Sequence, residues 1–339
     1  MKEIRSLILR ITERCNLHCA YCYAADSGCI VQDMSAQLAI EAVSRCCPEG
    51  GNLHIQFTGG EPLLNISVME QVYAFGKATG RKLRLAVQTN GTLLTPAYCH
   101  RLKAMQCAVG VSLDGLKEAN SLRTFSDGSD AFPQVLQGIR YLADASIRCN
   151  LTTVVTKANA ASLGQLPDLA LWLGNVNGVG LDLFRPLGRG KGEELMPLRE
   201  DLSHGLTELI HKTKELQQAG IPFRLREIER QKKRIQCNCC DLPYCYAQTE
   251  QSMCIDPAGN CWPCSSLAGV GRFFLGNIRD GLPEHNFSRS ALELPKKCRN
   301  CDILSACGGG CPAGRIAHCQ EPDSLTCLIN RILLEENGI

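Results

Sequence analysis

Three cysteines near the start of the chain have the spacing of a metal site that lacks one ligand. Cys15, Cys19 and Cys22 form a C-x3-C-x2-C run in the stretch RITERCNLHCAYCYA. A [4Fe–4S] cluster normally takes four thiolates, so three thiolates leave one iron with an open position. An open position of this kind also separates catalytic from structural zinc sites. The run therefore predicts an iron–sulfur site that binds an additional ligand, and zinc is the less favoured metal.

The cysteine content fits metal binding better than disulfide bonding. The sequence has 22 cysteines in 339 residues. Its N-terminus, MKEIRSLILRITERC, is charged and has no apolar stretch followed by a cleavage site, so it is not a signal peptide. In a reducing cytosol, clustered cysteines usually bind metal or iron–sulfur clusters. We therefore expect a cytoplasmic metalloprotein, with disulfide bonds as the alternative.

Charge and hydropathy argue against two classes of partner. Lys and Arg total 36 against 34 Asp and Glu, so the chain has no basic field for nucleic acid. The sequence has no run of about 18 apolar residues, so we expect no membrane-spanning segment.

The first two-thirds of the chain alternates apolar and amphipathic segments. The predicted strands cover residues 6–12, 53–59, 83–90, 107–115, 148–156 and 178–186, and the predicted helices cover 35–47, 67–80, 97–105, 132–145 and 200–219. This alternation predicts an α/β fold with a parallel sheet. Six units are too few for a closed eight-fold barrel, so we expect a partial (β/α)6 TIM-like barrel. The cysteine run follows the first strand, at the face where such barrels hold their active sites.

The remainder of the chain has a different composition. Residues 225–236, LREIERQKKRIQ, are interpreted as a charged connector whose basic run is a solvated helix face. From Cys237 onward, 13 of the 22 cysteines fall within 103 residues that are rich in Gly and Pro. Metal binding can organise such a segment with little apolar core, because its free energy is also folding free energy. We predict a barrel domain over 1–226 and a cysteine-rich iron–sulfur domain over 227–339.

Several motifs at the strand ends resemble one enzyme family. CNLHCAYCY is similar to the signature of radical S-adenosylmethionine (radical SAM) enzymes, and FTGGEPLL (57–64) resembles that family's GGEP segment. QTNGTLL (88–94), VSLDG (111–115) and Arg123 resemble the elements that surround the cofactor. The resemblance implies cofactor-binding roles for Tyr21, Gly59, Gly60, Glu61, Pro62, Asn90, Ser112, Asp114 and Arg123.

The resemblance also implies a reaction. The methionine amine and carboxylate of S-adenosylmethionine would bind the open iron held by Cys15, Cys19 and Cys22, and Glu61 would accept from the amine. Reduction by a flavodoxin or ferredoxin would release a 5′-deoxyadenosyl radical that abstracts a substrate hydrogen. Simpler roles remain open: GGEP as an ordinary Gly-Gly turn, Asp114 as a turn residue, and Arg123 as half of a surface ion pair.

The C-terminal cysteines resemble the SPASM extension, which binds two auxiliary [4Fe–4S] clusters. The resemblance implies an outer cluster on Cys298, Cys301, Cys307 and Cys327, and a nearer cluster on Cys245, Cys264 and Cys311 with Cys239 as fourth ligand. Three clusters are therefore expected in all. The fourth ligand could instead be Cys237, Cys240 or Cys254, or the position could be open. Cys319 competes with Cys327, and a zinc ribbon is the alternative for the whole segment. The other eleven cysteines are expected to be mostly buried apolar residues.

SPASM-type enzymes mostly modify peptides or proteins, so we expect a maturase of a ribosomally made peptide that forms a thioether or C–C crosslink. The formylglycine-forming relatives have an Asp directly after the cysteine at the Cys264 position, where this chain has Ser265. An epimerase, an enzyme acting on a small molecule or cofactor precursor, and a metal-binding scaffold are also compatible with these motifs.

The chain begins at its first strand, so a leader-binding protein is expected to be separate, or the barrel mouth alone reads the substrate. RPLGRGKGEE (185–194) is interpreted as a flexible mouth loop, with contact to the adenosyl group or an acidic substrate as the alternative.

Overall fold

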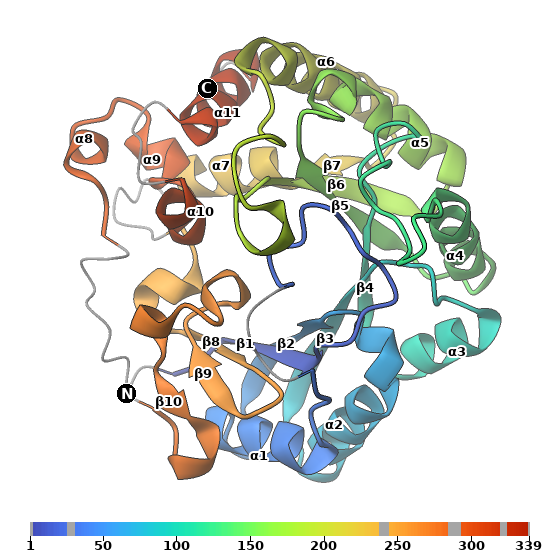
Figure 1. Cartoon of the computed structure of the whole chain (residues 1–339), viewed down its shortest axis with the longest axis vertical. Helices are drawn as coiled ribbons and strands as arrows, with labels where there is room; N and C mark the ends of the chain where they lie inside the picture. Colours follow the sequence, from blue (N-terminus) through green and yellow to red (C-terminus); the bar gives the residue numbers. More distant parts are fainter. Residues whose placement is uncertain (1–2, 26–30, 237–243, 284–292, 319–323, 338–339) are drawn as a thin grey trace.

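The computed structural model describes residues 3–25, 31–236, 244–283, 293–318 and 324–337. Its centre is a curved sheet of parallel strands, as the sequence predicts (Figure 1). These strands are β1 (Ser6–Thr12), β2 (Asn52–Gly59), β3 (Lys82–Thr89), β4 (Ala108–Ser112), β5 (Cys149–Val155) and β6 (Val176–Leu183). Each pairs with its neighbour in chain order, and the short β7 (Arg224–Leu225) pairs with β6.

Helices cover the outer face of this sheet (Figure 1). They are α1 (Ala36–Cys46), α2 (Ile66–Ala78), α3 (Pro96–Ala104), α4 (Phe132–Asp144), α5 (Leu166–Leu173) and α6 (Arg199–Gln218). Local signals set several boundaries: the Ser35 hydroxyl accepts from the Leu38 N–H to begin α1, and Gly220 takes a φ of +78° after α6. The sequence predicted all of these helices except α5, whose eight residues are too few to show a helical period.

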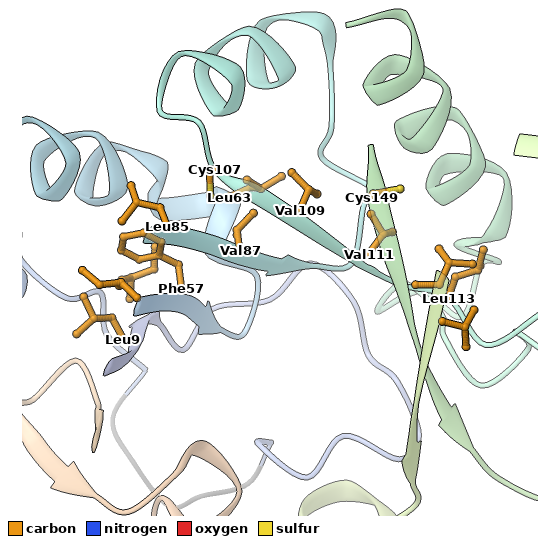
Figure 2. Packing of buried hydrophobic residues seen from close by; sticks show 14 of the residues in the cluster. Leu9, Phe57, Leu63, Leu85, Val87, Cys107, Val109, Val111, Leu113 and Cys149 are labelled. Atoms are coloured by element: carbon orange, nitrogen blue, oxygen red, sulfur yellow. The ribbon is translucent and has the colours of Figure 1, made fainter. Parts of the chain in front are cut away.

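Alternation along the strands separates the core from an inner cavity. Leu9, Phe57, Val87, Val109 and Val111 are buried between the sheet and the helices (Figure 2). Because successive side chains point to opposite faces of a strand, their neighbours point inward. These inward side chains include Thr58, Gln88, Ser112, Thr152 and Asp182, which line one cavity of about 200 Å³. The sheet therefore surrounds a pocket, the lumen, to which its strands contribute polar side chains.

The C-terminal part extends the same sheet, which the sequence did not predict. β8 (Ser252–Ile255) pairs in parallel with β1, and β9 (Asn260–Trp262) and β10 (Gly276–Asn277) follow as antiparallel strands. Cys254, Trp262, Leu267, Phe273 and Ala313 form a small apolar cluster. The segment therefore has more apolar packing than its composition suggested. Its division from the barrel at residue 226 stays a prediction.

The remaining helices lie along this C-terminal part. They are α7 (Arg226–Gln236), α8 (Lys296–Arg299), α9 (Leu304–Cys307), α10 (Pro312–Ala317) and α11 (Leu325–Asn337). The interpretation of 225–236 as a connector with a solvated basic face is wrong in part, because α7 buries Gln231 and Arg234. Among the described residues, no helix has the length and hydropathy needed to cross a membrane.

Candidate active site and cluster sites

Cys15, Cys19 and Cys22 lie together on the loop that leaves the C-terminal end of β1. All three line the lumen and also a larger open cavity of about 750 Å³. In Figure 1 this blue segment projects over the middle of the curved sheet. Burial raises the pKa of the Cys15 thiol to about 11. Metal ligation requires the thiolate, so a bound cluster would have to hold this group in its ionised form.

The GGEP segment packs directly on the cysteine loop. The N–H groups of Gly60 and Glu61 donate to the carbonyls of Thr12 and Arg14, each at 2.8 Å. A Cβ on Gly59 would lie 2.1 Å from the Thr12 oxygen, and one on Gly60 would lie 2.2 Å from the Arg14 oxygen. Only glycine allows this close approach. The two glycines therefore have a local reason to be present, and both line the lumen.

The Glu61 carboxylate is fully buried and ties this segment to β3. It accepts from the Thr89 hydroxyl at 2.7 Å, from the Asn90 N–H at 2.7 Å and from the Leu63 N–H at 3.1 Å. Burial raises the pKa of Glu61, and these three donors act in the opposite direction. Three of about four lone-pair positions are therefore occupied, and Glu61 itself is not among the residues that line the lumen. Pro62 follows at the first position of a short 3-10 helix, Pro62–Asn65.

Asn90 and Ser112 line the lumen from the ends of β3 and β4. The Asn90 side-chain amide donates to the Asn16 side chain at 2.9 Å, so it also touches the cysteine loop. The Ser112 hydroxyl accepts from Gln88 at 3.0 Å, and the Gln88 oxygen accepts from Thr152 at 3.2 Å. Gln88 and Thr152 had not been predicted as site residues. Their signal was the strand alternation itself, which placed polar residues at inward positions.

Tyr21, Asp114 and Arg123 form a buried polar cluster behind the cysteines. The Tyr21 hydroxyl donates to Asp114, and Arg123 donates to Tyr21 at 2.6 Å and lies 4.0 Å from Asp114. Asp114 and Arg123 are only 2% and 5% exposed. The simpler roles of a turn aspartate and a surface ion pair are therefore wrong. Tyr21 and Arg123 line the lumen, and Asp114 holds Tyr21 in place.

The segment after β6 is held against the cysteine loop. The Arg189 N–H donates to the Cys22 carbonyl at 3.0 Å, and the Arg189 guanidinium donates to the Cys19 carbonyl at 2.9 Å. The interpretation of 185–194 as a flexible loop is therefore wrong for its first part, residues 185–190, which these bonds tie to the cysteine loop. Arg189 was missed as a site residue because its partners lie about 170 positions away in the sequence.

Gly188 is the tightest point of that contact. Its φ is +61°, and a Cβ there would lie 2.3 Å from the Cys22 carbonyl oxygen. We expect Gly188→Ala to push the loop away from Cys22 and to lower the iron retained by the first cluster site, with a stability loss of about 1–3 kcal/mol. Iron content after gel filtration measures this effect. Gly192→Ala is the control, because Gly192 also has a positive φ but a Cβ there meets nothing within 4 Å. Equal losses for both variants would contradict the role of the contact.

The four cysteines assigned to the outer cluster share one cavity. Cys298, Cys301, Cys307 and Cys327 line a space of about 130 Å³. Cys327 is the third residue of α11, so it lies inside the terminal helix that was expected to follow it. Cys319, the competing ligand, lies outside the described residues.

The cysteines assigned to the nearer cluster are also close together. Burial, together with the neighbouring thiols of Cys311 and Cys245, raises the pKa of the Cys264 thiol to about 12. The fourth ligand, Cys239, lies outside the described residues, as do the alternatives Cys237 and Cys240. The alternative Cys254 is fully buried on β8, and its electrostatic neighbours include Cys264.

The first and outer sets of donors fit [4Fe–4S] clusters, and the three described cysteines of the nearer set lie close to one another. The ligands are cysteines, and two of the sets each line a common cavity. Within the described ranges, no three His, Cys, Asp or Glu side chains gather closely enough for a single metal ion. A four-iron cluster gives each thiolate its own iron, so its ligands are more widely spread than those of one ion.

Comparison with known proteins agrees with this geometry. Residues 9–169 match the model of the Radical SAM superfamily. These residues form a radical SAM domain, and the chain is a radical SAM enzyme. It is 29% identical over 301 residues to an uncharacterized protein of Methanocaldococcus jannaschii. The aligned region covers 88% of this chain and 94% of the relative.

Relatives with named activities include enzymes of several kinds. The chain is 27% identical to the AdoMet-dependent heme synthase of Methanosarcina barkeri, over 90% of each chain. It is 25% identical to the serine-type anaerobic sulfatase-maturating enzyme of Bacteroides thetaiotaomicron, over 93% of this chain and 84% of that one. The solved structure of native anSMEcpe with bound AdoMet and the Cp18Cys peptide is similar to this one, with a TM-score of 0.83 at 22% identity. The match covers 98% of this chain and 96% of that one. This last likeness confirms the fold.

Proposed function

We propose that the protein is a radical SAM maturase that abstracts a hydrogen from a ribosomally made peptide or protein and forms a thioether or C–C crosslink. The observation that carries the proposal is the shared lumen: Cys15, Cys19 and Cys22 line one cavity together with Gly59 and Gly60. The likeness to a peptide-bound maturase structure supports a peptide substrate. Cys15, Cys19 and Cys22 would hold a [4Fe–4S] cluster that binds S-adenosylmethionine, and this pair would supply a 5′-deoxyadenosyl radical.

Each predicted residue has a role in this scheme. Cys15, Cys19 and Cys22 hold the first cluster, and the bare backbone of Gly59 and Gly60 lets the methionine group approach closely. Glu61 offers its remaining acceptor position to the methionine amine. Asn90, Ser112, Tyr21 and Arg123 surround the cofactor, Pro62 sets the GGEP turn, and Asp114 fixes Tyr21.

The C-terminal part would hold two auxiliary clusters. We assign Cys298, Cys301, Cys307 and Cys327 to the outer cluster, and Cys245, Cys264, Cys311 and Cys239 to the nearer one. The division into a radical SAM barrel, 1–226, and a SPASM domain, 227–339, follows from these assignments. We further propose a cytoplasmic location, a flavodoxin or ferredoxin as reductant, and a separate leader-binding protein.

A small-molecule or cofactor-precursor substrate is the second candidate. The M. barkeri heme synthase favours it, since the two chains match over 90% of each length. Sulfatase maturation is supported less, despite the B. thetaiotaomicron relative. Ser265 stands where the formylglycine-forming enzymes have an aspartate, and a hydroxyl is a much weaker base than a carboxylate.

The first experiment measures iron, acid-labile sulfide and zinc in the anaerobically reconstituted protein. Three clusters require about twelve irons per chain and no zinc, at four irons each. About four irons with two zincs would contradict the auxiliary clusters and leave only the radical SAM core. The reconstituted protein should then release 5′-deoxyadenosine from S-adenosylmethionine under dithionite, and no release would contradict the enzyme proposal.

The second experiment identifies the substrate class. Short Cys- or aromatic-rich peptides encoded beside the gene are incubated with the enzyme, and mass spectrometry records the loss of two hydrogens that a crosslink produces. In parallel, an iron porphyrin with carboxylate side chains is tested for a mass change. Conversion of the porphyrin with no change in any peptide would favour the second candidate.

A further inference from the structure

Arg185 lies between the lumen and the cysteines assigned to the nearer cluster. It follows β6 by two residues, at the C-terminal end of the sheet. Its side chain lines the lumen together with Cys15, Cys19 and Cys22, and it also lines a second cavity of about 80 Å³ with Cys307 and Cys311. Asp182 and Leu183 line both spaces as well. These three residues therefore form the wall that the two cavities share.

The charged group of Arg185 faces sulfur on one side and an aromatic ring on another. Its Nη2 lies 4.0 Å from Cys311 Sγ, and its Cζ lies 5.8 Å from the centre of the Tyr23 ring. Cys264 also contributes to its electrostatic surroundings. Both cysteines are assigned ligands of the nearer cluster. The guanidinium is thus a cation that borders this ligand set from the lumen side.

Among the described residues Arg185 makes no ion pair within 4 Å of a carboxylate, and Asp182 acts on it only from a greater distance. Asp182 is three residues away, but it forms its ion pair with Arg226 at 3.1 Å. Arg185 Nε is buried and makes no hydrogen bond within the described part of the chain. A cation removed from water normally requires a counter-charge. A [4Fe–4S] cluster held by thiolates is an anion, and ligation by Cys311 would bring it close to this guanidinium.

We propose that Arg185 is a positioning residue that raises the reduction potential of the nearer auxiliary cluster. The proposal rests on the auxiliary clusters of the proposed function. Cluster potentials depend on net charge and on hydrogen bonds to the sulfurs, and Arg185 supplies a positive charge and an N–H donor at Cys311. A nearby cation stabilises the reduced cluster, which carries one more negative charge. The Tyr23 ring fixes the guanidinium in this position.

The test is a redox titration followed by electron paramagnetic resonance. The background protein carries Cys15→Ala, Cys19→Ala and Cys22→Ala, so only the auxiliary clusters remain. Adding Arg185→Met should shift one of the two midpoint potentials to a more negative value, by about 59 mV if the reduction equilibrium changes tenfold. Arg185→Lys should shift it less, because lysine keeps the charge but not the planar fork of donors.

Arg140→Met is the matched control. Arg140 lies on α4, where its guanidinium stacks on Trp172, and α4 and α5 are on the opposite side of the molecule from α10 in Figure 1. This variant removes the same charge at a distance and should leave both potentials unchanged. If Arg185→Met reduces the iron content, Arg185→Gln is compared with Arg185→Lys, and the Gln variant should have the lower potential.

Two results would overturn the inference. The first is an unchanged pair of potentials in Arg185→Met, and the second is an equal shift of both clusters, which would indicate a general field effect. Failure of the proposed function has a different signature: the background protein would contain no auxiliary iron at all. In that case the inference falls together with the cluster assignment, whereas loaded clusters without a shift refute the inference alone.

Discussion

Replacing Cys19 by alanine is expected to abolish release of 5′-deoxyadenosine from S-adenosylmethionine under reducing conditions. Cys19 is buried beside Cys15 and Cys22 at the lumen, and its carbonyl is fixed by Arg189. Loss of one of three thiolates should prevent the cluster from being held with a single open iron. The rate should fall by more than about 100-fold, since even partners in the second coordination shell cost 10–100-fold. Chromatography of the reaction mixture measures it.

Cys99→Ala is the control for this variant. Cys99 is fully buried on α3 and is not among the residues that line the lumen. The substitution should cost about 1 kcal/mol of stability and leave the cleavage rate within a factor of about two. Full cleavage by Cys19→Ala, or an equal loss in Cys99→Ala, would refute the assignment of the first cluster.

Local patterns in the sequence were enough to predict the barrel. Each strand from β1 to β6 is a short apolar run between turn residues, and most helices have an apolar face of regular period. The cysteine loop and GGEP could also be predicted, because each contains its chemistry in a few consecutive residues. Their mutual contact follows from the parallel order of β1 and β2, which brings both strand ends to one edge.

The parts that could not be predicted depend on contacts between distant segments. β8 has four residues, and its pairing with β1 joins positions about 250 residues apart, so no periodicity could indicate it. Arg185 and Arg189 acquire their roles only when the end of β6 meets the cysteine loop. Asp114 had the sequence context of a turn, Asp-Gly, and its burial depends on Tyr21 and Arg123 arriving from either side. Long-range packing decided all of these cases.

Replacing Arg123 by leucine should destabilise the protein strongly. Arg123 is the cation within the buried cluster of Tyr21 and Asp114, and its removal leaves the Asp114 carboxylate without a counter-charge. Breaking a buried pair in this way costs about 3–5 kcal/mol. The control is Arg101→Leu, which breaks the partly exposed ion pair of Arg101 with Glu70 and should cost no more than about 1 kcal/mol.

The effect of Arg123→Leu should also depend on pH. Burial raises the pKa of Asp114, and Arg123 opposes that shift in the native protein. Without Arg123 the pKa rises further, so the folded variant favours the protonated carboxyl. The deficit in stability should therefore be largest at neutral pH, where the unfolded chain ionises freely, and should shrink as the pH falls toward the ordinary pKa of aspartate, about 4. Thermal melting of both variants at about pH 5 and about pH 7.5 measures this. An equal loss at the two pH values would mean that packing, and not the uncompensated charge, is what Arg123 contributes.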